Sequence, residues 1–248
     1  MDSQILRQRR TIRKYKDKDI PQSLLNSLLQ TAAQASTTGN MQLYSVIVTR
    51  DAEKKKALAP AHFNQPMVTA APVVLTFCAD FNRFVKWCEL RNAKPGYDNF
   101  QSFLTATLDA VIFTQQFCTA AELEGLGICY LGTTTYNPDM IIKALSLPKL
   151  VMPVTTITAG YPDDMPQQPD RLPSCAYIHE EQYNDYDGKA IDSLYAPKEA
   201  LPENRGYVEE NGKETLAQVF TDIRYTKQNN EIFSVKFLET LKSQGFDF

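Results

Sequence analysis

The sequence has few of the side chains with which proteins usually hold metal ions or activate nucleophiles. Its 248 residues include only two histidines, His62 and His179, which stand far apart, and no C-x-x-C pair. Zinc and two-histidine iron sites need closer groups of ligands, so no metal site is expected. The P-loop pattern and the G-x-S-x-G turn of serine hydrolases are also missing. If the chain is an enzyme, a bound cofactor should supply the reactive group.

Long apolar runs and a strong charge excess are missing as well. No stretch approaches the roughly 20 apolar residues of a membrane-spanning helix, and the first residues lack the pattern of a secretory signal. A net charge of −3 argues against a general nucleic-acid binder. Five cysteines form no close pairs, and four have apolar neighbours. We therefore expect buried free thiols, a cytoplasmic protein, and two surface histidines without a catalytic role.

Hydrophobic periodicity predicts a single α+β domain over residues 1–248. Helices are expected at about 21–35, 52–58, 99–124, 138–145, 214–227 and 230–244, and strands at 45–49, 73–78 and 154–161, with a further short strand between two turns within 125–132. The pattern at 99–124 is apolar on most faces, which indicates a helix buried in the core or packed against a second subunit. Residues 162–212 are rich in proline, tyrosine and acidic residues without clean periodicity. They predict an irregular excursion that wraps a neighbour or frames a site.

The most informative segment is Arg9-Arg10-Thr11-Ile12-Arg13, which places three guanidiniums and one hydroxyl within five residues. Forked donors, fixed positive charge and a short hydroxyl are the groups that bind a phosphate. An extended backbone would place side chains 9, 11 and 13 on one side. The alternative is a solvated basic run continuing into Lys14, Lys16 and Lys18.

Together with four further segments, this one resembles the NfsA/Frp-like branch of the FMN-dependent nitroreductase family, which comprises NAD(P)H-dependent nitro- and flavin reductases. The other segments are Ser36-Thr37-Thr38-Gly39-Asn40-Met41-Gln42, residues 77–83, residues 125–132 and Asp170-Arg171-Leu172-Pro173. The resemblance spans most of residues 5–180. It implies a nitroreductase-like fold, with a central mixed, mainly antiparallel sheet flanked by helices and the long helix at a homodimer interface.

The resemblance also implies which residues bind FMN. Arg9 and Thr11 would face the FMN phosphate with Arg10 beside them, and Arg13 would lie near flavin N1 and O2. Thr37 would contact the flavin from the partner subunit, and Gln65 would bind the edge of the isoalloxazine. The backbone of one turn would lie close to the ring, and this turn comprises Tyr130, Leu131, Gly132 and Thr133. A second arginine, Arg171, would bind the phosphate.

The implied activity is electron transfer from NADPH or NADH through FMN to nitroaromatic, quinone or flavin acceptors, in a ping-pong mechanism. It needs no catalytic side chain, since FMN carries the chemistry and Arg13 supports charge near N1. The sequence departs from the family pattern at Pro169, where a lysine is usual, and at Thr133, where glycine is frequent. Residues 203–213 hold only two basic residues among three glutamates, so they do not decide between NADH and NADPH. The alternatives are a non-catalytic FMN-binding sensor or carrier, and a phosphate-binding module unrelated to flavin.

Overall fold

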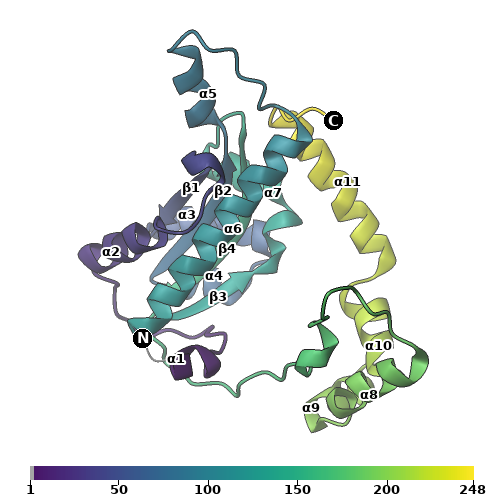
Figure 1. Ribbon diagram of the computed structural model, residues 1–248. Coiled ribbons are helices and arrows are strands. Elements are labelled where there is room, and N and C mark those ends of the chain that lie inside the picture. The colour runs from purple at the N-terminus through teal and green to yellow at the C-terminus, as the bar shows by residue number, and fades with distance from the viewer. Residues whose placement is uncertain (1–2) are drawn as a thin grey trace. The chain divides into compact units, whose positions relative to one another are not determined.

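The computed structural model describes residues 3–248, and the chain divides into two compact units. The first unit comprises Met1–Gln168 and Phe233–Phe248, and the second comprises Pro169–Ile232. Each unit is described by itself (Figure 1). Within residues 3–248, no helix combines the length and the apolar character needed to cross a membrane.

The first unit is built on a four-stranded antiparallel sheet. The strands lie in the order β1 (Tyr44–Thr49), β2 (Val73–Asp80), β4 (Val151–Gly160) and β3 (Gly127–Leu131), so β1 and β3 are the edges. All three pairings are antiparallel, which confirms the expected α+β class with a mainly antiparallel sheet. Strand β4 begins earlier than predicted. The reason is that Pro153 pairs with Cys78 at an irregularity in the register, where a sheet tolerates proline.

The helix α6 (Phe100–Leu123) covers one face of this sheet (Figure 1). It begins where Asn99 Oδ1 accepts a hydrogen bond of 3.0 Å from the Ser102 N–H, so its predicted extent is confirmed. Its Phe113 ring lies 5.7 Å from the Phe77 ring of β2. The buried cluster on this face also takes in α2 (Gln22–Ala32), which packs beside α6.

Short helices cover the other face of the sheet. They are α3 (Ala52–Leu58), α4 (Pro66–Ala70) and α7 (Pro138–Leu145), joined by two 3-10 turns, η2 (Ala59–His62) and η3 (Gly132–Thr135). Their core includes Val74 and Leu131, whose strand neighbours Val73 and Ile128 face α6. This alternation is the period of two expected for strands covered on both faces. It also determines which face of β3 carries each side chain.

Three further elements complete the first unit. They are α1 (Ser3–Arg7), the 3-10 turn η1 (Thr38–Asn40) and α5 (Asn82–Glu89). The C-terminal part of α11 (Lys227–Ser243) also belongs to this unit, and its Leu241 packs with Phe103 and Phe246 in a third buried cluster.

The second unit contains more helix than the sequence led us to expect. Its elements are η4 (Ser174–Ala176), α8 (Gly188–Glu199), α9 (Pro202–Glu210), α10 (Leu216–Gln218) and the π-helical turn η5 (Val219–Arg224). Two of these helices, α8 and α9, lie inside the stretch 162–212 that was expected to be irregular. The Asp187 side chain caps α8 by accepting from the Ala190 N–H at 2.8 Å. Pro197 stands inside the same helix and obscured its pattern in the sequence.

Candidate active site

The arginine segment at residues 9–13 lies along the free edge of β3. The Ile12 N–H donates to the Ile128 carbonyl at 3.0 Å, which attaches the segment to the edge of the sheet. The Ile12 side chain is buried over Gly127, where a Cβ atom would come within 2.6 Å of it. Glycine is therefore required at position 127. Because Ile12 points inward, its neighbours Thr11 and Arg13 point outward, and Arg13 is exposed.

Tyr15 fixes the end of this segment. Its hydroxyl lies 2.8 Å from the Ile12 carbonyl and 2.7 Å from Thr158 Oγ1, and the following Lys16 N–H donates to the Tyr161 carbonyl at 2.9 Å. Burial raises the pKa of Tyr15 far above its ordinary value, so the phenol keeps its proton and remains a donor. The backbone that carries the arginines is thus held by hydrogen bonds to β3 at Ile128, to β4 at Thr158 and to Tyr161 just after β4.

Arg9 is oriented by a carboxylate of α6. Its Nε lies 3.1 Å from Glu122 Oε1 and 3.4 Å from Oε2, and the exposed fractions of the two side chains are 30% and 10%. Burial raises the pKa of Glu122 although Arg9 acts in the opposite direction. Because Glu122 takes the Nε of Arg9, the two terminal nitrogens have no hydrogen-bond partner among residues 3–248 and can meet another anion. Arg10 is held differently, since its Nη1 donates to the Pro166 carbonyl at 3.0 Å.

The end of β3 presents an open surface beside these arginines. Tyr130 faces the α6 side of the sheet, with its hydroxyl 3.4 Å from Gln115 Oε1, and its side chain is 37% exposed. Leu131 points into the opposite core. A Cβ atom on Gly132 would meet nothing within 4 Å, so the space above this turn is free for a ligand. Burial raises the pKa of the Cys129 thiol beneath, and the nearby Arg13 opposes that effect.

His62 is fully buried, which corrects the expectation of a surface histidine. Its exposed fraction is 0%, and its Nδ1 lies 2.9 Å from Thr133 Oγ1 in the turn η3. The turn η2, which ends at His62, packs on α3 and α7 and contributes Ala59 and Ala61 to the buried apolar cluster on this face. Three residues later comes Gln65, so this contact brings the loop of Gln65 next to the turn at Thr133.

Thr37 is fixed by a buried carboxylate near the middle of α6. Its hydroxyl donates to Asp109 Oδ2 and accepts from the Gln42 N–H at 2.9 Å. Asp109 is only 2% exposed and also accepts from the Thr38 N–H and hydroxyl at 2.9 and 3.0 Å. The loop after α2 is therefore pinned to α6 by one side chain.

Within one chain, the structure brings together only part of the predicted FMN site. Arg9, Arg10, Thr11, Arg13 and Tyr130–Thr133 gather at β3, with Gln65 beside them. Asp109 and Glu122, which hold Thr37 and Arg9, are 13 residues apart on α6, or about 20 Å at the rise of an α-helix. Thr37 therefore lies at a distance from Arg9 in its own chain. Arg171 belongs to the second unit, where its Nη1 donates to the Asp170 carbonyl at 2.8 Å.

The residues that hold the predicted ligands were not found from the sequence. Asp109 and Glu122 are the two charged residues of a helix whose other residues are uncharged, and a charge at a core-facing position was the available signal. Tyr15 and His62 gave no comparable signal, because neither places a charged side chain in an otherwise uncharged helix, and their partners are evident only from the structure. The expectation for the cysteines is confirmed, since all five are free and four are buried.

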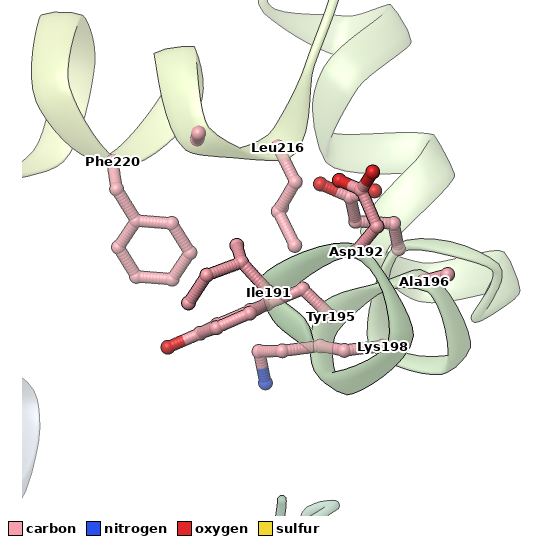
Figure 2. A pocket seen from close by; sticks show the side chains of 9 residues that line it. Ile191, Asp192, Tyr195, Ala196, Lys198, Leu216 and Phe220 are labelled. Carbon is pink, nitrogen blue, oxygen red and sulfur yellow. The ribbon is translucent and has the colours of Figure 1, made fainter. Parts of the chain in front are cut away.

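A cavity of about 530 Å³ lies within the second unit. Figure 2 shows Ile191 and Tyr195 of α8 facing Leu216 of α10 and Phe220 of η5 across it. None of the residues predicted to bind FMN lines this cavity. Within residues 3–248, no group of three or more histidine, cysteine or acidic side chains could hold a metal ion.

Comparisons with known proteins agree with the resemblance seen in the sequence. The Nitroreductase family model matches residues 6–161. The chain is 33% identical to an FMN reductase [NAD(P)H] of Bacillus subtilis over 96% of its length and 94% of the relative. It is 32% identical to an oxygen-insensitive NADPH nitroreductase of Salmonella typhimurium, with the same two shares of chain length.

A solved structure gives the same result for the fold. The crystal structure of a Bacteroides fragilis protein has 63% sequence identity and a TM-score of 0.98, and the match covers 99% of this chain and all of that one. The family model covers more than half of the chain, and the full-length relatives exceed 30% identity. The chain belongs to the nitroreductase family.

Proposed function

We propose that this protein is an FMN-dependent oxidoreductase that uses NADH or NADPH to reduce nitroaromatic, quinone or flavin acceptors, acting as a cytoplasmic homodimer. The observation that carries the proposal is the arrangement at β3, where fixed arginines border an open turn. Arg9 offers two terminal nitrogens, and the space beside Gly132 is free. The names of the Bacillus and Salmonella relatives, an FMN reductase and an NADPH nitroreductase, support the same activity.

The residues at β3 fit the two ends of FMN. Arg9, Arg10 and Thr11 would hold the phosphate through charge-assisted hydrogen bonds, and the backbone of Tyr130–Thr133 would lie under the ring. The chemistry supplied by bound FMN would be hydride acceptance from the nicotinamide and, in a separate half-reaction, electron transfer to the acceptor. Arg13 is exposed and would place positive charge beside the ring edge that becomes negative on reduction.

The homodimer is supported by an apolar stripe on α6. Five of its side chains are large, apolar and exposed, and they recur at helical spacing along one face: Phe100, Leu104, Leu108, Val111 and Ile112. Thr37 also lies about 20 Å along α6 from the anchor of Arg9. A second chain packed on the stripe would supply Thr37 to the FMN of the first. Light scattering coupled to gel filtration should therefore give twice the 28.0 kDa chain mass.

The choice of nicotinamide follows from the segment 203–213. It forms most of α9, and Lys213 is already paired with Asp222 at 2.9 Å. The remaining cation, Arg205, stands on a helix with three glutamates. A 2′-phosphate would find little free positive charge in this segment, so both NADH and NADPH should serve as donors. The five free cysteines fit a reducing cytoplasm.

The test combines a visible spectrum with anaerobic reduction. The purified protein should carry a flavin that is released as FMN, and NADH or NADPH should bleach it, with colour restored by a quinone. Arg13→Ala should retain FMN but slow its reduction about tenfold or more, because positive charge near the ring is lost. A protein that holds FMN but is reduced by neither donor would be the non-catalytic carrier, and the proposal would fail. A protein that takes up no FMN would also refute it.

A further inference from the structure

The buried imidazole of His62 connects two loops that border the proposed FMN site. Its Nδ1 lies 2.9 Å from Thr133 Oγ1, and its backbone carbonyl accepts from the Gln65 N–H at 3.2 Å. One residue therefore contacts both the turn expected beneath the flavin ring and the residue expected at the ring edge. In the described part of the chain, His62 Nε2 is buried without a partner, so the contact to Thr133 is the side chain's only hydrogen bond.

This bond determines where the Thr133 side chain points. Thr133 directly follows Gly132, whose Cβ direction is open space. A β-branched side chain at this position could place its hydroxyl or its methyl group over that space. Because its hydroxyl is bonded to a fully buried ring, the hydroxyl is directed into the core and away from the open side.

The chain between His62 and Gln65 makes an unusual corner. Phe63 and Asn64 both adopt left-handed backbone conformations, with φ of 53° and 54°. Such conformations are costly for a phenylalanine and persist only where surrounding contacts fix them. The Asn64 N–H donates to the Ala59 carbonyl at 2.8 Å, and the imidazole at the start of the corner is held by Thr133. The orientation of Gln65 therefore depends on the same contact.

We propose that His62 is a positioning residue for the FMN site, which holds the Thr133 side chain away from the ring and fixes Gln65 at its edge. The inference rests on the proposed function. The imidazole acts as a neutral hydrogen-bond partner and transfers no proton, since burial lowers the pKa of His62 to about 4. This assigns a role to a side chain that would not touch the cofactor.

A double-mutant cycle between His62 and Thr133 tests this role. His62→Leu removes the hydrogen bond and should raise the FMN dissociation constant about tenfold, through misplacement of Thr133 and Gln65. In a Thr133→Gly background no side chain remains to be held, so the same His62→Leu change should then have an effect of less than about twofold. His62→Asn keeps a polar atom close to the position of Nδ1 and should recover most of the affinity.

Two measurements make the outcome decisive. Urea unfolding of the FMN-free proteins shows whether each variant is folded. If His62→Leu is not folded, Thr133→Val replaces it, because this change exchanges only the hydroxyl for a methyl group. Equal effects of His62→Leu in both backgrounds, in proteins that bind FMN, would overturn the positioning role and leave the oxidoreductase proposal intact. A wild-type protein that binds no FMN would overturn both.

Discussion

Two threonine hydroxyls of the proposed site are held by buried groups of different kinds. Thr37 is bonded to Asp109, and Thr133 is bonded to His62. Asp109 accepts four hydrogen bonds, from the hydroxyls of Thr37 and Thr38 and from two backbone N–H groups, whereas His62 makes one through its side chain. Both side chains are almost completely removed from solvent.

The difference shows what a core requires of each group. A carboxylate can remain buried when several donors replace its water, and the loop after α2 supplies them. The imidazole has one partner and apolar neighbours, so burial drives its pKa down and it stays neutral at pH 7. The loop at Thr37 is therefore anchored strongly by many bonds, and the turn at Thr133 more weakly by one.

The largest effect should come from removing the stronger anchor. Asp109→Ala leaves two backbone N–H groups and two hydroxyls without their acceptor, and the free energy of unfolding should fall by about 3–5 kcal/mol. Urea denaturation measures this loss. Gln116→Ala, an exposed change on the same helix, should stay within about 0.5 kcal/mol of wild type. If both variants lost the same stability, Asp109 would not be the anchor of this loop.

The contribution of the weaker anchor, His62, to the free energy of unfolding should depend on pH. The pKa of His62 is about 4 in the folded protein and about 6.5 when unfolded, so below pH 6.5 the unfolded chain binds the extra proton. Stability from this residue is complete above pH 6.5 and is lost as the pH falls towards 4, by about 3 kcal/mol in total. Unfolding free energies of wild type and His62→Asn, measured from pH 7 to 4, should converge across this window.

A matched control separates His62 from the general effect of acid. His179→Asn makes the same substitution at the other imidazole of the chain and is measured over the same pH range beside wild type and His62→Asn. A His62→Asn protein that lost stability as steeply as wild type would show that the buried imidazole contributes nothing to this window.

Much of the fold was predictable because its strongest elements have local causes. Residues 99–124 lack proline and glycine and begin at an Asn cap, so the limits of α6 were predicted within one residue. Strand β2 was evident from a continuous apolar run that is buried on both faces. Two elements were not predicted correctly because they contain a proline. Pro153 made β4 appear to start later than it does, and Pro197 interrupted the helical pattern of α8.

Residues of the candidate site could be proposed from the sequence only where a residue type matches the chemistry of a ligand. Arginines near a threonine have the chemistry that binds a phosphate, so they can be proposed as ligands from the sequence. The residues that hold these arginines in place depend on tertiary contacts. His62 lies in a stretch of proline, phenylalanine and asparagine that looks like a surface loop. Only the packing of that loop on α3 and α7 buries the ring. The local sequence around His62 therefore did not predict that its ring is buried.

The comparison of anchors extends from hydroxyls to guanidiniums. Arg9 is oriented by the Glu122 carboxylate through Nε and keeps its terminal nitrogens free, whereas Arg10 uses a terminal nitrogen on the Pro166 carbonyl. Arg9→Ala should therefore raise the FMN dissociation constant about 10- to 100-fold, and Arg10→Ala about threefold. Fluorescence titration of the apoprotein with FMN measures both. Equal losses would mean that net charge, not orientation, governs the phosphate contact.

The smallest effect should come from the carboxylate that orients Arg9. Glu122→Gln keeps a hydrogen-bond acceptor beside Nε but removes the charge, so FMN affinity should fall only about two- to threefold, because the bond that orients Arg9 remains. Glu124→Gln removes an exposed charge two residues away and should leave affinity unchanged. Because burial raises the pKa of Glu122, wild-type affinity should begin to fall on acidification before an ordinary carboxyl would titrate, and Glu122→Gln should lack that early step. If Glu122→Gln still showed the early loss of FMN affinity, the orientation of Arg9 would not depend on the charge of Glu122. The carboxylate would then have no part in binding FMN.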